Sequence, residues 1–186
     1  FRSNNIDIAM LGHLPPQVVR FEHLVLPSGP HVIRFNTFMM PIRKDLESAF
    51  TKIASENPPG LIIDLRGNLG GLGGLGIGLA GHLISKKDFH LGEQITRNGN
   101  MFFDVSPRMK SKRFGGKVAI LVDELSVSTS EIVAGGLQDI ERARVFGSKT
   151  PGMALPSVIV KLPNGDSFQY AVADLKKPSG GRYEGE

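Results

Sequence analysis

Three short apolar runs, each followed by a loop and then by a helical pattern, constrain the fold of this chain most strongly. The runs and the helical patterns that follow them occupy residues 31–38 and 41–56, 60–65 and 77–84, and 117–123 and 130–140. Apolar residues recur at helical spacing in the longer segments, whereas the short runs are typical of buried strands. Repeated strand–loop–helix units predict a mainly parallel sheet covered by helices. We therefore expect an α/β fold.

The rest of the chain predicts additional strands. Residues 143–146, 157–162 and 167–173 have strand character, and the Pro-Asn-Gly-Asp sequence at 163–166 predicts a hairpin turn between the last two. Residues 1–30 carry short apolar runs broken by proline and glycine, so we interpret them as a connecting segment with a hairpin. The predicted core domain is then 31–186.

Composition excludes several classes of function. The 186 residues contain no cysteine, which excludes disulfides, cysteine nucleophiles and zinc–thiolate sites. The net charge of +4 is modest, and the basic cluster at 108–113 lacks interleaved aromatics, so we expect a solvated loop and no nucleic-acid partner. No apolar run reaches the roughly 18 residues of a membrane span. The histidines form no pair with metal-ligand spacing, and we expect neither a metal nor another cofactor.

Two loops are the best candidates for a functional site, because α/β sheets bind ligands beyond the carboxyl ends of their strands. The first, 64–71, is rich in glycine and could direct backbone N–H groups at a developing negative charge. Its spacing fits neither a dinucleotide-binding fingerprint nor a Walker phosphate loop. The second, 123–130, places three hydroxyls at alternate positions before a helix, where a serine nucleophile benefits from the helix N-terminus. Simple helix capping by Ser128 or Ser130 with Glu131 would explain the same residues.

Taken together, these segments resemble the C-terminal processing peptidase family, also called tail-specific proteases. The matching segments, in chain order, are 60–71 (GLIIDLRGNLGG), 126–135 (SVSTSEIVAG), 138–139 (QD), 144–147 (RVFG), 162–165 (LPNG), 178–180 (PSG) and 184–185 (EG). The resemblance implies a Clp protease/crotonase-like α/β core with a C-terminal β-hairpin. It also implies a serine endopeptidase that acts on polypeptide chains.

The resemblance assigns roles to individual residues and shows one gap. It implies that Ser128 is the nucleophile and that backbone amides around Gly70, Gly71 and Thr129 form the oxyanion hole. The family's general base is a lysine kept neutral by an apolar pocket, and this chain has Met153 at that position. Because a thioether cannot accept the serine proton, the Ser–Lys dyad is broken.

Replacement bases are few. Lys149 lies four residues before Met153 and could fold back toward the serine. A related branch of the family uses histidine, and His31 begins a strand that we expect to point toward the same sheet edge. Asp139 and Glu131 match acidic positions of the family near the site, although a carboxylate there could equally cap the helix or pair with Arg142.

The resemblance leaves two functions open, and a third follows from the capping interpretation. The chain is a serine endopeptidase with an atypical or missing base, or a catalytically inactive module that binds extended polypeptide ends by strand addition. Alternatively, the serines only cap a helix of a structural domain. The resemblance further implies a PDZ domain upstream of residue 1 and export to a bacterial periplasm or cell envelope, and it allows a homo-oligomer.

Overall fold

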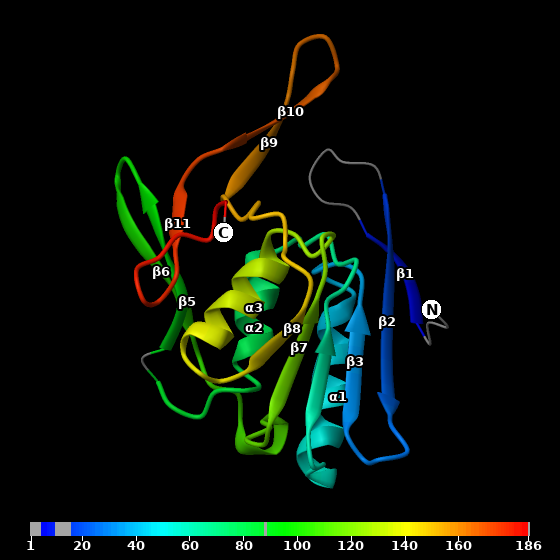
Figure 1. The fold of residues 1–186 in the computed structure, drawn as a ribbon. Coiled ribbons are helices and arrows are strands. Elements are labelled where there is room, and N and C mark those ends of the chain that lie inside the picture. The colour runs from blue at the N-terminus through cyan, green and yellow to red at the C-terminus, as the bar shows by residue number, and fades with distance from the viewer. Residues whose placement is uncertain (1–4, 10–15, 88, 186) are drawn as a thin grey trace.

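A six-stranded sheet forms the centre of the molecule (Figure 1). The computed structural model describes residues 5–9, 16–87 and 89–185. In spatial order the strands are β1 (Asn5–Ala9), β2 (Gln17–Val25), β3 (His31–Phe35), β4 (Leu61–Asp64), β7 (Val118–Val122) and β8 (Arg144–Gly147). The last four run parallel, whereas β1, β2 and β3 pair antiparallel. The predicted α/β fold with a mainly parallel sheet is confirmed.

The register of the parallel strands explains why the apolar runs fold in this way. Ile33, Ile63 and Ile120 are neighbours across β3, β4 and β7, and all three side chains are fully buried. Burial of a side chain of this size contributes about 1.5–3 kcal/mol. One row of isoleucines therefore fixes the register of three strands that lie far apart in the sequence.

Three helices follow the parallel strands. They are α1 (Ile42–Glu56), α2 (Gly73–Ala80) and α3 (Thr129–Asp139), with a 3₁₀ turn, η1 (Lys110–Lys112), packed against α1. α1 also packs on β2 and β3, whereas α2 packs against α3. α2 begins four residues earlier than predicted, since glycines hide its helical pattern. A Cβ at Gly76 would lie 2.7 Å from Thr129 Cγ2, so the close approach of α2 to α3 requires glycine at this position.

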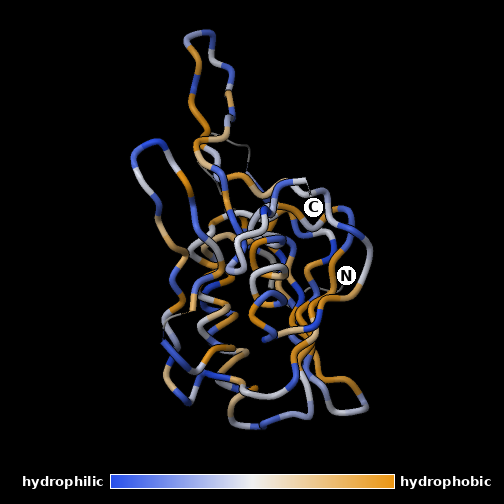
Figure 2. The backbone as a smooth tube through the Cα atoms, turned by 60° about the vertical axis from the view of Figure 1, so that its left-hand side comes forward, coloured by the Kyte–Doolittle hydropathy of each residue, from blue (hydrophilic) through white to orange (hydrophobic). Residues whose placement is uncertain are grey.

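Two smaller sheets extend from the main sheet (Figure 1). The hairpin of β9 (Ser157–Lys161) and β10 (Ser167–Ala171) confirms the turn predicted at 163–166. The other sheet joins β5 (Phe89–Thr96), β6 (Gly99–Val105) and β11 (Asp174–Lys176), which the sequence analysis missed. Figure 2 shows hydrophobic residues along the β9–β10 hairpin, beyond the body of the molecule.

Residues before 31 contribute to the main sheet where the structure describes them. β1 and β2 pair with each other, and β2 pairs with β3 over five residue pairs. This segment therefore adds two strands to the core sheet, and the domain boundary at 31 and the upstream PDZ domain stay predictions. No helix in the described part of the chain has the length and apolar character to cross a membrane.

Candidate active site

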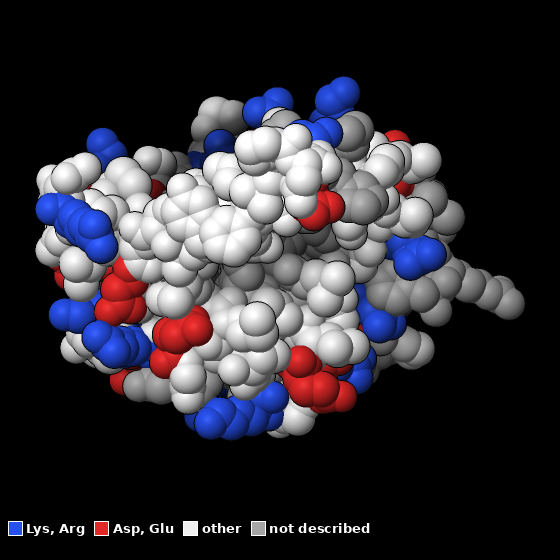
Figure 3. All heavy atoms as spheres, turned by 90° about the horizontal axis from the view of Figure 1, so that it is seen from above, with Lys and Arg blue, Asp and Glu red and all other residues white. Residues whose placement is uncertain are grey.

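A cleft of about 830 Å³ lies at the carboxyl ends of the parallel strands, and we call it the Ser128 cleft. Its walls come from the glycine-rich loop, the start of α3, residues 153–157 and the β9–β10 hairpin. Figure 3 looks down on this end of the sheet and shows mainly uncharged residues toward the centre, with most Lys and Arg side chains at the rim. Apart from backbone groups, the cleft is largely apolar, as ligand sites in proteins usually are.

Ser128 lies in this cleft with a strained backbone. Its φ of 57° and ψ of −116° fall outside the conformations that a serine ordinarily adopts. The other described non-glycine residues with positive φ, Asn57 and Glu141, lie just past the ends of α1 and α3, where such angles are common. Strain of this kind costs about 1–3 kcal/mol and is typical of functional sites. The turn presents Ser128 directly before the first residue of α3.

The two neighbouring serines hold the loop and do not line the cleft. Ser126 is fully buried and donates from Oγ to the Leu65 carbonyl at 2.8 Å. Ser130 is also fully buried and donates from Oγ to the Asn68 carbonyl at 3.0 Å. The structure therefore separates three hydroxyls that the sequence could not distinguish, and only Ser128 among them lines the cleft.

Asn68 connects the glycine-rich loop to the nucleophile segment. It is fully buried, and its Nδ2 donates to the Phe35 carbonyl of β3 at 2.8 Å. Its Oδ1 accepts from Gly70 N at 2.9 Å and from Ser130 Oγ at 3.0 Å. Val127 N also donates to the Asn68 carbonyl at 3.0 Å. One buried amide thus fixes both loops that the sequence identified.

The three residues expected at the oxyanion hole lie together, but their N–H groups differ. Gly70 packs against the nucleophile so closely that a Cβ would lie 2.8 Å from Ser128 Cβ. However, its own N–H already donates to Asn68. The Gly71 carbonyl accepts from Thr129 Oγ1 at 2.8 Å, and the bridge between Gly71 and Phe38 uses Gly70 O and Leu72 N. Thr129 begins α3, and the first N–H groups of a helix have no partner within it, whereas these contacts of Gly71 leave its N–H unused. The N–H groups of Thr129 and Gly71 are therefore the better candidates.

Glu131 joins the nucleophile to the loop that carries Met153. Its carboxylate is 5% exposed, and Oε2 accepts from Ser128 N at 2.7 Å and from Met153 N at 3.0 Å. Oε1 accepts from Gly152 N at 2.6 Å. Ser128 and Glu131 form the capping box expected of a plain helix start. The same carboxylate also binds the loop that carries Met153. Both backbone nitrogens, of residues 128 and 153, lie within 3.0 Å of one oxygen.

The C-terminal segment supports the same loop from its other side. Ala154 N donates to Glu184 Oε2 at 3.0 Å, and Gly185 N donates to the Gly152 carbonyl at 2.9 Å. Met153 lines the cleft with Ser128 and is 61% exposed. Position 153 therefore lies in the same cleft as the nucleophile, and its thioether cannot accept a proton.

Two of the candidate replacement bases lie elsewhere. His31 begins β3, and the register pairs it with the first residue of β4, whereas Ser128 follows the carboxyl end of β7. The expectation that His31 points to the same edge as Ser128 was wrong, because strands that run parallel begin at the opposite edge from the one at which they end. His31 is instead buried between Glu56 Oε2, 3.0 Å from its Nε2, and His23 Nε2, 3.0 Å from its Nδ1. Lys149 is exposed and is not among the described residues that line the cleft.

Asp139 also lies away from Ser128. It ends α3, about 16 Å along an eleven-residue helix that begins just after the serine. Its carboxylate accepts from Ser179 N at 2.6 Å and from Ser179 Oγ at 2.8 Å. Arg142, which the sequence offered as a partner for the acidic residues, donates instead to the carbonyls of Leu83 and Phe114.

Comparison with known families agrees with this geometry. A family model described as peptidase family S41 matches residues 31–186. The chain belongs to peptidase family S41. A structure of a photosystem II D1 C-terminal processing protease superimposes on this S41 chain with a TM-score of 0.72 and 25% identity, covering 89% of this chain and 45% of that one. The Clp protease/crotonase-like core expected from the sequence is confirmed.

Curated S41 relatives have names of the same kind. The chain is 28% identical over 155 residues to the chloroplastic C-terminal processing peptidase of Tetradesmus obliquus, and 31% identical over 166 residues to the carboxy-terminal-processing protease of Bartonella bacilliformis. These alignments cover 80% and 82% of this chain. The chain spans only 31% and 36% of the lengths of these two relatives.

Sequence reasoning missed part of this S41 site. Asn68 carried no motif signal of its own, and the bridging role of Glu131 depends on a loop more than twenty residues away. Within the described residues, no group of three or more His, Asp or Glu gathers so as to hold a metal ion. The ionisable side chains among the described cleft residues are Glu184 and Tyr170, and the Glu184 carboxylate already accepts from Ala154.

Proposed function

We propose that this chain is the peptidase core of a C-terminal processing serine endopeptidase that acts through Ser128 and lacks the family's general base. The observation that carries the proposal is the strained Ser128 at the start of α3, inside a cleft that it shares with Gly71, Thr129 and Met153. A serine that served only as a cap would not require a cleft in front of it.

The chemistry follows from these positions. Ser128 Oγ attacks the carbonyl carbon of a peptide bond, and the N–H groups of Gly71 and Thr129 stabilise the oxygen that becomes negative. The proton of the hydroxyl has to pass to water, because Met153 cannot accept it. Loss of a general base typically costs about 10²- to 10⁴-fold in rate, so turnover is slow.

A polypeptide is the substrate class that fits the cleft. Apolar side chains make up much of its lining, and the β9–β10 hairpin contributes Ser157, Ile159 and Gln169 among others. The register pairs Ile159 with Gln169, so these two side chains project from the same face of the hairpin. An extended chain can add to strands of this kind through main-chain hydrogen bonds. Location in a bacterial envelope remains part of the proposal, since relatives with these names include both bacterial and chloroplastic proteins.

A catalytically inactive module that holds polypeptide ends is the second candidate. The observation that favours it is Met153 in the cleft that holds Ser128, since its thioether cannot serve as a base. This candidate keeps the cleft and the binding mode and removes only the chemistry. The two functions therefore differ in whether Ser128 can be made to react.

Covalent labelling separates them. A serine-directed phosphonate probe is incubated with the wild-type chain, Ser128→Ala, Met153→Lys and Lys149→Met, and adducts are followed by intact mass. We expect slow single labelling of the wild type, none of Ser128→Ala, and an unchanged rate for Lys149→Met. Met153→Lys should label faster, because the neutral form of its amine can accept the serine proton. We expect a gain of only about 10- to 100-fold at neutral pH, since an exposed amine keeps a pKa near 10.4 and stays mostly protonated.

The outcomes decide between the candidates. Labelling that disappears in Ser128→Ala supports a reactive nucleophile. Absence of labelling in the wild type together with rapid labelling of Met153→Lys supports the inactive module. If a folded Met153→Lys variant labels no faster than the wild type, position 153 does not serve the nucleophile and the assignment of the base position is wrong.

A further inference from the structure

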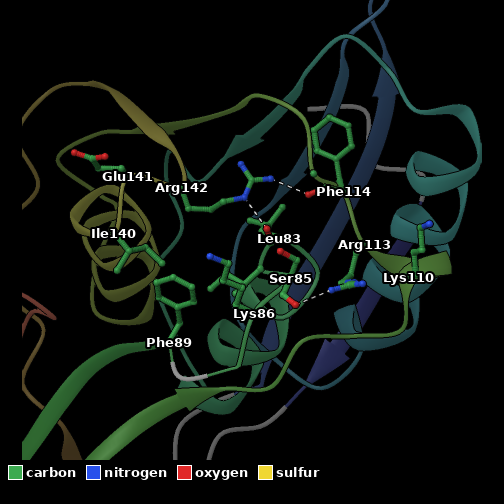
Figure 4. Close-up of a pocket in the computed structure, with 12 residues that line it drawn as sticks. Leu83, Ser85, Lys86, Phe89, Lys110, Arg113, Phe114, Ile140, Glu141 and Arg142 are labelled. Carbon is green, nitrogen blue, oxygen red and sulfur yellow. Dashed lines mark hydrogen bonds between the residues drawn. The ribbon is translucent and has the colours of Figure 1, made fainter.

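A second pocket, separate from the Ser128 cleft, lies at the opposite end of α3. Its volume is about 510 Å³, and it shares no lining residue with the cleft. The lining residues include Leu83, Lys86, Phe89, Gly115, Ile140 and Arg142 (Figure 4). We call it the Arg142 pocket.

The charges around this pocket are unbalanced. Lys86, Lys110, Arg113 and Arg142 line it, and Glu141 is the one acidic residue among its described lining residues. In Figure 4 the Glu141 carboxylate points away from the guanidinium of Arg142. No ion pair joins these lining cations to a carboxylate within the part of the chain that the structure describes. The pocket therefore presents positive charge.

Arg142 is held in place by neutral groups. Its Nε donates to the Leu83 carbonyl at 2.6 Å, and one terminal nitrogen, NH2, donates to the Phe114 carbonyl at 2.7 Å. A guanidinium carries five N–H donors, so donors remain beyond these two bonds. Burial lowers the pKa of this guanidinium, because part of its surface is removed from water. A half-buried charge of this kind is stabilised by an anion.

Arg113 is a second arginine of the pocket lining. Its NH1 donates to the Ser85 carbonyl at 3.1 Å (Figure 4). Its Nε is buried and has no hydrogen-bond partner among the described residues. This atom has almost no surface that a ligand could reach, so Arg113 adds positive charge to the pocket lining without a direct contact from Nε.

The end of α3 does not supply an alternative site for a cation. The carbonyls of Gly136, Leu137 and Gln138 accept from the backbone N–H groups of residues 140–143. These bonds satisfy the helix end internally.

The rest of the wall is apolar. Leu83 and Phe114 are buried, and Phe89 and Ile140 pack against the hydrophobic core while keeping part of their surface exposed. We propose that the Arg142 pocket binds a carboxylate that carries an apolar group, with the carboxylate on the guanidinium of Arg142 and the apolar group on Phe89 and Ile140. Guanidinium and carboxylate match in a two-bond geometry that a neutral amide cannot reproduce. Two ligands share this chemistry: a fatty acid anion and a peptide C-terminus with an apolar last residue.

Paired acid and amide probes test the proposal. Octanoate and octanamide are titrated by calorimetry into the full chain. Acetyl-Ala-Ala-Leu with a free C-terminus and its C-terminal amide are titrated into Ser128→Ala, which prevents cleavage. Binding of octanoate supports the fatty acid source, and binding of the tripeptide acid alone supports the peptide source. In either case the acid should bind at least about ten times more tightly than its amide.

Gly115→Leu is the blocking variant, since Gly115 lines the pocket, its φ lies outside the left-handed region and a Cβ would meet no atom within 4 Å. It should abolish binding. Lys86→Gln should weaken binding about two- to five-fold, and Lys87→Gln, an exposed neighbour outside the pocket, should not. If Gly115→Leu does not fold, nuclear magnetic resonance replaces it: octanoate or the tripeptide acid should shift the Gly115 amide and the Arg142 Nε–H signals and leave the Gly71 amide unmoved.

Three results would overturn the proposal. They are no binding of either acid up to about 10 mM, equal binding of acid and amide, and binding that Gly115→Leu leaves intact.

Discussion

Replacement of Glu131 by glutamine should loosen the active-site region more than any other single-atom exchange near Ser128. The carboxylate accepts from the N–H groups of Ser128, Gly152 and Met153, using both oxygens. A glutamine amide has one oxygen and one NH₂ group, so in either orientation its NH₂ faces at least one of these donors. The chain cannot relieve the conflict by solvation, because the side chain is 5% exposed.

The expected magnitude follows from these contacts. Hydrogen bonds to a charged acceptor contribute about 1.5–3 kcal/mol each, and a buried donor left without a partner costs about 1–3 kcal/mol. In Glu131→Gln one of the three hydrogen bonds is lost and the others are weakened, because the acceptor is no longer charged. Together these effects lower the free energy of unfolding by about 3 kcal/mol. For a chain of this length that lowers Tm by roughly 6–12 °C.

Thermal unfolding and hydrogen exchange measure the effect together. Glu184→Gln is the matched control, since Glu184 is half-buried and its carboxylate accepts one backbone N–H, from Ala154. We expect about 1 kcal/mol for this control. Amide exchange of Gly152 and Met153 should accelerate in Glu131→Gln. Equal Tm values for the two variants, with unchanged exchange at residues 152 and 153, would refute the bridging role of Glu131.

Three further predictions concern single side chains. Gly70→Ala should destabilise the chain by about 2–3 kcal/mol and slow labelling of Ser128 with the phosphonate probe, because φ is +80° and the new Cβ would lie 2.6 Å from the Val127 carbonyl. Tyr183→Phe should cost about 1–2 kcal/mol in a urea melt, since the buried hydroxyl donates to Leu91 O at 2.5 Å. Burial lowers the pKa of His82 below 6.5, so the unfolded chain binds that proton first and unfolding free energy should fall below about pH 6.5. In urea melts across that range, His82→Gln should reduce the slope without abolishing it, because the pKa of His23 is lowered too.

The sequence predicted the parallel strands well because their apolar runs carry two signals at once. Each run is short and buried, and each is followed by a loop and a helical pattern, so that local pattern and topology agree. The β5–β6 hairpin was missed although Asn98-Gly99 is a strong turn signal. Its flanks alternate poorly: β6 exposes most of its residues, and β5 contains the bulge between His90 and Glu93.

The site could be predicted only in part, because several of its determinants are tertiary. Ser126, Ser128 and Ser130 are equivalent as a sequence pattern, and contacts to Leu65 and Asn68 alone decide which two are buried. The prediction that His31 lies at the same sheet edge as Ser128 failed for another reason, which is the direction of the strands. A residue that begins a parallel strand cannot meet one that follows the end of its neighbour.

Glu131 also decides how the gap at Met153 should be interpreted. The carboxylate accepts a hydrogen bond from the backbone N–H of residue 153, and this contact does not depend on which side chain that residue has. Ala154 N and Gly152 O are held by Glu184 and Gly185 in the same way. A lysine introduced at 153 would therefore enter a loop whose course is already fixed, and its side chain would start from a position that lines the Ser128 cleft. Only the side chain at position 153 then differs between the two proteins, while the backbone around it stays the same. Met153→Lys therefore tests the chemistry without testing the fold.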